Sequence, residues 1–332
     1  MTVSMGKLRG LAQVSTDGGI FAILACDQRG ALRRMMEKAG RVPADFEAVV
    51  RMKEEIVGPL APYSSGVLLD PEYSAAQLLA RRVLPGRVGL VVALEETGYE
   101  ERNGDRLTRL LTDWSVSKIK AMGASAVKLL IYYNPRREAA AAHQRQVVEQ
   151  VARECHEYDI PLMVEPVVYP SRDGDEDGFR REKADLVVET ARHMSEFAVD
   201  LLKMEFPLHP TAGDDPGLWR DACLRLDEAC RVPWALLSAG VDFATYRRQL
   251  EAACRAGASG FVAGRAIWRE AVEMTDEPAR QAFLTGEMPR RLRELVDVAS
   301  RYGRPWWERP SHQISAADAP EGWYASYPGF RG

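Results

Sequence analysis

The sequence has few histidines and cysteines, and neither type is spaced as a metal site. Its 332 residues include five histidines and five cysteines. No cysteines form a C-x-x-C pair, which excludes a zinc knuckle, and their odd number and scattered positions argue against disulfides. A metal-dependent enzyme would need several histidines at strand ends, and only His209 follows such an end. We therefore expect no metal and no cofactor, and interpret the cysteines as small buried residues.

The sequence also lacks the features of nucleic-acid-binding and membrane proteins. Its net charge is −4, so no broad basic field is available to hold a nucleic acid, although a local basic pocket could still bind a small anion. No apolar run approaches the ~18 residues that span a bilayer. The first residues, "MTVSMGKLRGLAQVSTDGG", contain no signal-peptide apolar core. We expect a cytoplasmic protein with neither kind of partner.

Short apolar runs alternate with amphipathic stretches along most of the chain. The strand-like runs cover residues 21–27, 66–70, 88–95, 125–133, 161–169, 199–207, 233–240 and 259–268. Helical patterns between them include residues 138–158, 181–198 and 242–257. Near-continuous apolar strands that alternate with helices indicate a parallel sheet covered on both sides. Eight such units predict an α/β fold with a single closed (β/α)₈ TIM barrel.

No glycine-rich dinucleotide fingerprint follows the first strand, where "CDQRGALRR" differs from G-x-G-x-x-G, and this argues against an open sheet. No linker-like stretch divides the chain, so we assign residues 1–307 to the barrel. Residues 308–332 form a C-terminal extension rich in tryptophan, tyrosine and proline. The extension could pack on its own subunit, close the bottom of the barrel or contact a partner chain. A homo-oligomer is compatible with the sequence.

Polar residues gather where the predicted strands end, which is the edge that carries chemistry in such barrels. In chain order they are Asp27, Gln28, Arg29, Asp70, Glu72, Glu95, Glu96, Lys128, Glu165, Lys203, Glu205, Ser238, Ala239, Gly240, Gly264 and Arg265. The set describes a cup with charged walls. An alternative is that Lys128, Glu165 and Lys203 form an ion-pair layer kept for packing, although such a network is rarely the cheapest way to stabilise a core.

Two lysines lie within apolar strands, Lys128 in "SAVKLLIYY" and Lys203 in "VDLLKMEFP". Burial and a second cation nearby are expected to lower the pKa of such a lysine, which makes it a nucleophile toward carbonyls. A neighbouring carboxylate such as Glu165 would move the protons of a Schiff-base reaction. Glu205 lies two residues beyond Lys203 and is expected on the same inward face.

The ends of the seventh and eighth strands are the usual place for a phosphate in this fold. The backbone of Ser238, Ala239 and Gly240, and that of Gly264, can approach an anion closely. The Ser238 hydroxyl and the Arg265 guanidinium add donors. The nearby "DGDEDG" segment, residues 173–178, resembles the start of a calcium loop but has Ala184 at the twelfth position, so we interpret it as a solvated loop over the barrel mouth.

Taken in order, several motifs together resemble the class I tagatose 1,6-bisphosphate aldolase family. They are "AILACDQRGALRRMM", "LLDPEYS", "LEETGYE", "VKLLIYYNP", "LMVEPVVYP", "DLLKMEFP" and "LLSAGVDFATYRRQLEAACRAGASGFVAGRAIW", between about residues 20 and 307. The resemblance implies reversible, metal-independent cleavage of a ketose 1,6-bisphosphate into dihydroxyacetone phosphate and glyceraldehyde 3-phosphate.

The resemblance also implies roles for individual residues. Lys203 would form the Schiff base, Glu165 would be the acid and base, and Lys128 and Asp27 would support them. The C1-phosphate pocket and the substrate cup would be formed by Ser238, Ala239, Gly240, Gly264, Arg265, Gln28, Arg29 and Glu95.

The same family includes aldolases that act on 6-deoxy-6-sulfofructose 1-phosphate and release sulfolactaldehyde. Both substrates carry the C1 phosphate and the C2 ketone, and differ in a phosphate or a sulfonate at the far end. The charged loop after residue 170 could contact that end. A non-catalytic barrel that binds sugar phosphates is a further alternative, but binding alone does not require Lys128, Glu165 and Lys203 together.

Overall fold

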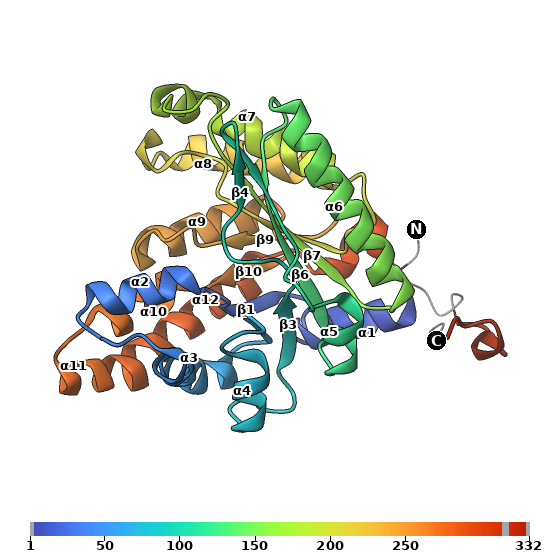
Figure 1. Cartoon of the computed structure of the whole chain (residues 1–332). Helices are drawn as coiled ribbons and strands as arrows, with labels where there is room; N and C mark the ends of the chain where they lie inside the picture. The colour runs from blue at the N-terminus through green and yellow to red at the C-terminus, as the bar shows by residue number, and fades with distance from the viewer. Residues whose placement is uncertain (1–2, 314–318, 330–332) are drawn as a thin grey trace.

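Eight parallel strands close into a barrel in the computed structural model, which describes residues 3–313 and 319–329. Around the barrel the order is β1, β10, β9, β8, β7, β6, β3 and β2 (Figure 1). The barrel strands are β1 (Phe21–Cys26), β2 (Gly66–Leu69), β3 (Gly89–Ala93), β6 (Ala126–Tyr133), β7 (Leu162–Val168), β8 (Leu201–Met204), β9 (Trp234–Leu237) and β10 (Gly260–Ala263). Each strand falls within one of the predicted runs, so the predicted TIM barrel is confirmed.

Helices cover the outside of the barrel. In chain order they are α1 (Met5–Gln13), α2 (Gly30–Lys38), α3 (Phe46–Leu60), α4 (Ala75–Ala80), α5 (Val116–Ala121), α6 (Glu138–Glu157), α7 (Glu176–Met194), α8 (Pro216–Ala229), α9 (Phe243–Ala256), α10 (Arg265–Glu273), α11 (Glu277–Ala282) and α12 (Met288–Tyr302). α6 and α9 match their predictions within a residue at each end. α7 begins earlier than predicted, because the Asp175 side chain accepts a hydrogen bond from the Gly178 N–H and caps the helix there.

The run predicted as one strand over residues 259–268 contains a strand and a helix. β10 ends at Ala263 and α10 begins at Arg265, with Gly264 between them. A Cβ on Gly264 would lie 2.3 Å from the Ala25 carbonyl oxygen, so only glycine fits this turn without displacing β1. The apolar run continues because both the strand and the buried face of α10 pack in the core.

Side chains alternate between the inside of the barrel and the layer under the helices. The interior cluster contains Phe21, Ile23, Ala25, Leu68, Val91, Ala126, Met163, Leu201, Ala235 and Val262. Leu11 and Val14, from α1 and the residue after it, belong to the same cluster as Trp306 and close the N-terminal end of the barrel. The interior is therefore packed at its base, which leaves only the opposite end for a ligand.

A short antiparallel hairpin stands outside the barrel and was not predicted. It consists of β4 (Glu100–Arg102) and β5 (Asp105–Leu107), inserted between β3 and α5. Asn103 and Gly104 form its two-residue turn, with φ of 54° and 79°. Asn-Gly between two short strands is the strongest local signal for such a hairpin, so the sequence did contain the evidence. In Figure 1 the hairpin lies beside the upper parts of β6 and β7.

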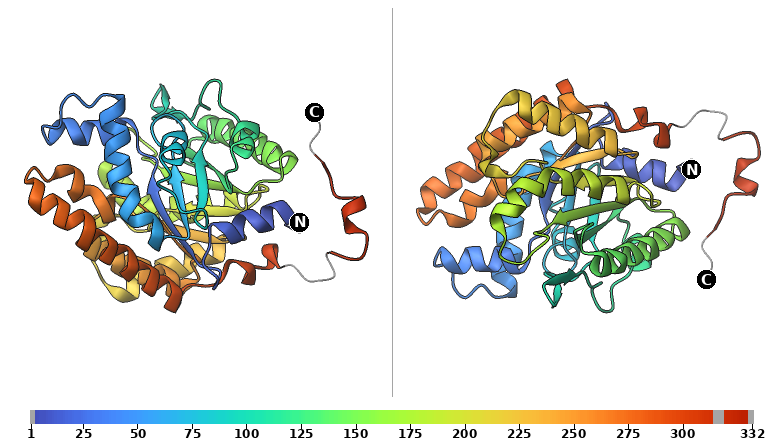
Figure 2. Two further views of the ribbon diagram at one scale, coloured as in Figure 1. Left: turned by 90° about the horizontal axis from the view of Figure 1, so that it is seen from below. Right: turned by 90° about the horizontal axis from the view of Figure 1, so that it is seen from above.

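The start of the C-terminal extension packs against the base of its own barrel. Arg309 is buried, forms an ion pair with Asp227 and donates to the carbonyl oxygen of Gly257 at 3.1 Å. Farther along, the Tyr327 hydroxyl accepts a hydrogen bond from the Gly6 N–H at 2.9 Å. Figure 2 shows the last described residues of the chain on the same side of the molecule as the N-terminal helix. Residues 314–318 and 330–332 of the extension lie outside the described residues. The division between barrel and extension at residue 307 stays a prediction.

The five cysteines are free and buried, as expected from their scattered positions. Within residues 3–313 and 319–329, no helix combines the length and the apolar character needed to cross a membrane.

Asp70 lies behind the barrel wall and not in the cup, which corrects one sequence prediction. Its carboxylate forms an ion pair with Lys53 of α3, and neither side chain is exposed to solvent. The same carboxylate accepts hydrogen bonds from the N–H groups of Glu72 and Tyr73 at 3.0 and 2.7 Å. Lys53 also donates to the Cys26 carbonyl oxygen at 2.8 Å. The pair therefore ties α3 to the ends of β1 and β2.

Asp70→Asn is expected to lower the free energy of unfolding by about 3–5 kcal/mol, because it leaves the Lys53 ammonium buried without its counterion. Urea unfolding of the variant and the wild type measures the difference. Glu54→Gln is the matched control: it removes the carboxylate from an exposed pair with Arg81 and should cost less than about 1 kcal/mol. Equal losses in the two variants would contradict the structural role given to Asp70.

Candidate active site

Five ionisable side chains meet inside the C-terminal end of the barrel. The Lys128 Nζ lies 2.9 Å from the Asp27 Oδ2, 2.6 Å from the Glu95 Oε1 and 3.0 Å from the Glu165 Oε2. The Lys203 Nζ lies 2.9 Å from the other oxygen of Glu165, Oε1. All five side chains are at most 10% exposed. We call Asp27, Glu95, Lys128, Glu165 and Lys203 the charged ring.

The charged ring follows from the alternation of side chains along each strand. Lys128, Glu165 and Lys203 each come two residues after an interior apolar residue, namely Ala126, Met163 and Leu201. A spacing of two returns the side chain to the same face, one level nearer to the mouth. The sequence prediction that these residues face one another is consistent with these distances.

Lys128 is held as a cation, which corrects the expectation of a lowered pKa. Burial alone would lower its pKa, but the carboxylates of Asp27, Glu165 and Glu95 outweigh burial and raise the pKa well above its usual value. The reciprocal effect appears at Asp27. Burial would raise the pKa of this carboxyl, but Lys128 and then Lys203 lower it well below its usual range. Lys128 is therefore a fixed positive charge at neutral pH and a poor nucleophile.

Lys203 has a different environment, because among the described residues its ammonium has one carboxylate partner, Glu165. Glu165 is shared: one oxygen contacts Lys203 and the other lies beside Lys128. The Oε2 contact with Lys128 is an ion pair and not an aligned hydrogen bond, and among the described residues this buried oxygen has no hydrogen-bond partner. Glu165 is thus placed to exchange a proton with Lys203 while keeping an oxygen available to a substrate.

The donor set of the charged ring does not favour a metal ion. Its three carboxylates, Asp27, Glu95 and Glu165, all converge on the Lys128 ammonium. That ammonium occupies the position in which a cation would be bound, and its charge would repel one.

Glu205 is directed away from the charged ring, although it lies two residues after Lys203. Its Oε2 accepts a hydrogen bond from the Val168 N–H at 2.9 Å, and its Oε1 lies 3.5 Å from the Lys183 Nζ of α7. β8 ends at Met204, so the alternation that placed Glu205 beside Lys203 no longer applies. Glu205 joins the end of β7 to α7.

Gln28 and Arg29 follow β1 and differ in how far their hydrogen-bonding groups are already used within the protein. Arg29 donates to the Glu72 Oε2 and to the Glu95 carbonyl oxygen, both at 2.7 Å, so it braces the wall beside Glu95. Gln28 donates to the Asp27 Oδ1 at 3.1 Å. Its side-chain oxygen is buried and has no hydrogen-bond partner among the described residues. Of the two, Gln28 has the unused hydrogen-bonding capacity that a substrate hydroxyl would satisfy.

The predicted phosphate residues meet at one corner of the mouth, between the ends of β9 and β10. Ala239 and Gly240 both have positive φ, 45° and 80°, and alanine adopts such a conformation rarely. The Arg265 guanidinium carbon lies 3.4 Å from the position that a Cβ on Gly240 would occupy. Arg269 donates to the Gly240 carbonyl oxygen at 2.9 Å and holds the turn in place.

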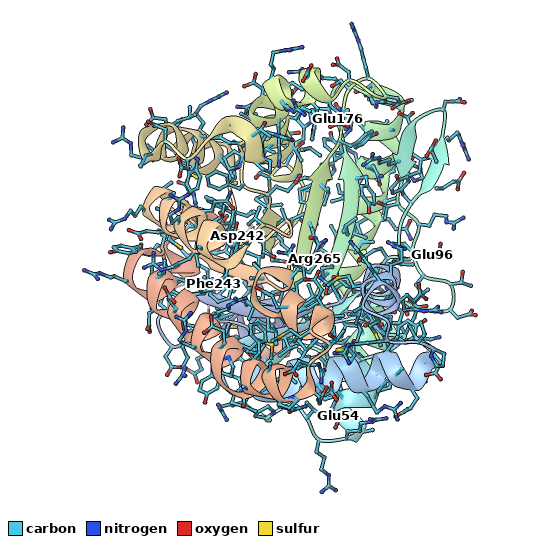
Figure 3. All side chains as sticks on the ribbon, turned by 90° about the vertical axis from the view of Figure 1, so that its left-hand side faces the viewer. Glu54, Glu96, Glu176, Asp242, Phe243 and Arg265 are labelled. Atoms are coloured by element: carbon cyan, nitrogen blue, oxygen red, sulfur yellow. The ribbon has the colours of Figure 1, made fainter. Side chains whose placement is uncertain are left out.

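The charges at this corner are available to a ligand. Within the described residues, the Arg265 guanidinium forms no ion pair or hydrogen bond. Arg265 is also the first residue of α10, so its N–H lacks a helical acceptor. Figure 3 labels Arg265 there, and Asp242 at the neighbouring start of α9. We call Ser238, Ala239, Gly240, Gly264 and Arg265 the anion corner.

Residues 173–178 are mostly exposed to solvent, and the second half of the segment belongs to α7. Asp173 pairs with Arg137, Asp175 caps α7, and Glu176 and Asp177 already belong to that helix. Arg137 also pairs with Asp105 of β5 at 3.1 Å, which joins the loop to the unpredicted hairpin.

Comparisons of the sequence with known proteins all identify aldolases as similar proteins. Residues 21–270 match the sequence profile of the DeoC/LacD family aldolases. The chain is 32% identical to tagatose 1,6-diphosphate aldolase 2 of Enterococcus faecalis over 325 residues, which covers 92% of this chain and 97% of that one. It is 33% identical to tagatose 1,6-diphosphate aldolase 1 of Streptococcus pyogenes serotype M3 over 328 residues, covering 93% and 100%.

Solved structures show the same fold at lower identity. An archaeal fructose-1,6-bisphosphate aldolase, with its catalytic lysine bound to a carbinolamine intermediate, superposes with a TM-score of 0.58 at 20% identity, over 88% of this chain and 98% of that one. The fructose-bisphosphate aldolase of Plasmodium falciparum superposes with a TM-score of 0.68 at 14% identity, over 89% and 94%. At these identities the likeness concerns the fold alone.

Proposed function

This chain belongs to the DeoC/LacD family of aldolases, and we propose that it cleaves a ketose 1,6-bisphosphate such as tagatose 1,6-bisphosphate through a Schiff base on Lys203. The products would be dihydroxyacetone phosphate and glyceraldehyde 3-phosphate. One observation carries the assignment of the nucleophile: within the described part of the chain, Lys203 has a single carboxylate partner, at 2.9 Å, whereas Lys128 has three. The substrate class is supported by the names of the relatives.

The chemistry begins with a proton transfer that the charged ring permits. Lys203 loses a proton to Glu165, and the neutral amine attacks the C2 carbonyl to form a carbinolamine. Glu165 returns the proton to the carbinolamine hydroxyl, which leaves as water and gives an iminium. The Lys128 ammonium lies 3.0 Å from the Glu165 Oε2, and the other oxygen of Glu165 lies beside Lys203, so the carboxylate is held next to the amine.

Cleavage of the bond between C3 and C4 follows from the iminium. The C4 hydroxyl gives its proton to the Glu165 carboxylate, the aldehyde leaves, and the bonding electrons pass to the iminium to form an enamine. Protonation at C3 and hydrolysis then release dihydroxyacetone phosphate and restore the Lys203 amine. Each step uses one carboxylate alternately as base and acid.

The anion corner positions this reaction. β8 and β9 are neighbours in the barrel, so a C1 phosphate bound by Ser238 and Arg265 holds C2 beside Lys203. Backbone N–H groups, a hydroxyl and a guanidinium are the donors that phosphate prefers. The retained phosphate of dihydroxyacetone phosphate would keep the enamine aligned after the aldehyde has left.

Side-by-side kinetics of the wild-type chain test the proposed function. We expect release of dihydroxyacetone phosphate from tagatose 1,6-bisphosphate, unaffected by EDTA, with kcat/KM compared for fructose 1,6-bisphosphate and 6-deoxy-6-sulfofructose 1-phosphate. A kcat/KM highest for the sulfonate substrate would reassign the chain to the sulfofructose phosphate alternative. Loss of activity in EDTA would contradict the metal-independent mechanism.

A further inference from the structure

We propose that Arg106 and Tyr132 bind the anionic group at the far end of the substrate, a phosphate ester or a sulfonate. The inference rests on the proposed function, because that function places C1 in the anion corner and C2 at Lys203. It adds a specificity site on the opposite rim, built partly from the hairpin β4–β5.

The order of strands in the barrel determines where the far end must lie. The anion corner is at the ends of β9 and β10. Counting around the closed barrel, β6 lies opposite β10 and β3 lies opposite β9. A ketose phosphate held at the anion corner, with its carbonyl at Lys203, therefore extends toward the ends of β3 and β6. The hairpin follows β3, and Tyr132 is on β6.

Among the arginines of this rim, Arg106 differs in its partners. Arg102 pairs with Glu100, Arg109 pairs with Glu96, and Arg137 pairs with two carboxylates. In the described part of the chain, Arg106 has no ion pair, and its guanidinium carbon lies 5.1, 5.9 and 5.0 Å from the ring centres of Tyr99, Tyr132 and Tyr169. Aromatic rings hold a guanidinium by its charge and leave its N–H donors free.

The position of Arg106 is fixed by its backbone and by the rings beside it. Its carbonyl oxygen accepts a hydrogen bond from the Gln144 side chain of α6 at 2.8 Å. The Tyr99 and Tyr132 rings meet edge to face with their centres 4.7 Å apart. A cation held in this way is already ordered before a ligand arrives, which reduces the entropy lost on binding.

The charged residues around Arg106 determine from which side an anion can reach its guanidinium. Arg106 borders a cavity of about 270 Å³ that is also lined by Glu101, Asp173 and Glu176. Asp173 is paired with Arg137, but Glu101 and Glu176 form no ion pair among the described residues, so their charges make the cavity unfavourable to an anion. On the inner side stands Tyr132, an inward-facing residue four positions after Lys128 on β6. An anion therefore reaches Arg106 from within the cup.

Tyr132 supplies a second donor at this place. Its hydroxyl forms no hydrogen bond with the described residues. Burial, and next the Glu165 carboxylate, raise the pKa of Tyr132, so the phenol keeps its proton at neutral pH. The phenol and the guanidinium together match the tetrahedral oxygens that a phosphate ester and a sulfonate share.

Kinetics with three substrates test the inference: tagatose 1,6-bisphosphate, 6-deoxy-6-sulfofructose 1-phosphate and tagatose 1-phosphate, which has no far-end anion. Arg106→Ala is expected to lower kcat/KM by about 30-fold on the first two, mostly through KM, because charged hydrogen bonds are lost. The change on tagatose 1-phosphate should stay below about 3-fold. Tyr132→Phe should give a smaller loss with the same pattern. If Arg106→Ala lowers kcat/KM for the bisphosphate alone, the site binds a phosphate. If it lowers kcat/KM for the sulfonate substrate alone, the site binds a sulfonate.

Two control variants make the result decisive. Arg102→Ala removes an exposed arginine from the same hairpin and should leave all three kcat/KM values unchanged. Arg172→Ala removes an exposed arginine of the loop after β7, the segment that the sequence had suggested for the far-end anion. A loss confined to Arg172→Ala, or an equal loss by Arg106→Ala on all three substrates, overturns the inference.

The outcomes separate this inference from the proposed function. A wild-type enzyme that releases dihydroxyacetone phosphate from none of the three substrates overturns the proposed function, and the inference with it. A wild-type enzyme that cleaves them while Arg106→Ala changes nothing overturns the inference alone.

Discussion

Lys203→Ala is expected to abolish covalent trapping and to lower kcat by roughly 10⁴-fold or more, the scale of losing a covalent nucleophile. Incubation of the wild-type chain with dihydroxyacetone phosphate and borohydride should add the reduced adduct irreversibly at Lys203. The physical reason is local: Lys203 has one carboxylate at 2.9 Å that can accept its proton. Mass spectrometry of the intact chain and of its peptides measures the adduct.

Lys128→Met is the matched control for this prediction. It removes the other buried lysine, whose three carboxylates keep it protonated. Trapping at Lys203 should persist in Lys128→Met, although turnover falls because the charge beside Glu165 is gone. An adduct that survives in Lys203→Ala would contradict the assignment and would move the nucleophile elsewhere. An adduct found on Lys128 in the wild type would do the same.

Glu165→Gln is expected to lower kcat by about 10²–10⁴-fold, the usual contribution of a general acid and base. Glutamine keeps the size of the side chain but cannot carry the proton between Lys203, the carbinolamine hydroxyl and the C4 hydroxyl. Because the nucleophile remains, slow trapping by borohydride should still be detectable.

Glu95→Gln tests whether any loss of negative charge in the ring has the same effect. Glu95 contacts Lys128 at 2.6 Å and accepts from the Leu130 N–H at 3.0 Å, but it forms no ion pair with Lys203 in the described residues. We expect a loss of kcat of about 10-fold or less, since the proton path remains. If Glu95→Gln and Glu165→Gln lose equal activity, with the same pH profile, the role of Glu165 is electrostatic and not proton transfer.

The same two variants address the alternative that the ring is an ion-pair layer kept for packing. A structural layer would lose stability when a carboxylate is removed and would leave both trapping and turnover of the folded protein unaffected. The proposed function instead predicts that Glu165→Gln separates trapping from turnover. Urea unfolding measured beside kcat distinguishes the two explanations.

Where the sequence was informative, the information came from strand periodicity. Alternation along apolar runs placed Lys128, Glu165 and Lys203 on inward faces, because the side-chain period of a strand is two. The same rule was wrong for Glu205, because β8 ends one residue earlier and the Glu205 side chain contacts Lys183 of α7. It was wrong for Asp70 for a related reason: past the end of β2, a turn directs this carboxylate to Lys53.

The electrostatic environments of the buried lysines and of Arg106 were the features that the sequence predicted least well. The sequence indicated two lysines of similar character, in similar apolar strands. Their difference depends on how many carboxylates reach each ammonium, and those carboxylates come from strands far apart in the chain. Likewise, the free guanidinium of Arg106 could not be recognised while its hairpin and the three rings around it were unplaced.

The sequence by itself determined the barrel, the inward faces of its strands and the residue types at the strand ends, because these follow from short-range periodicity and local turn chemistry. The tertiary structure alone decided which lysine is a fixed cation, which arginines are free, and that the hairpin stands opposite the anion corner. Those properties depend on distances between different segments of the chain, such as Asp27 and Glu95 against Lys128, which are 101 and 33 positions apart. Coulomb interactions and burial are set by such distances and not by order along the chain.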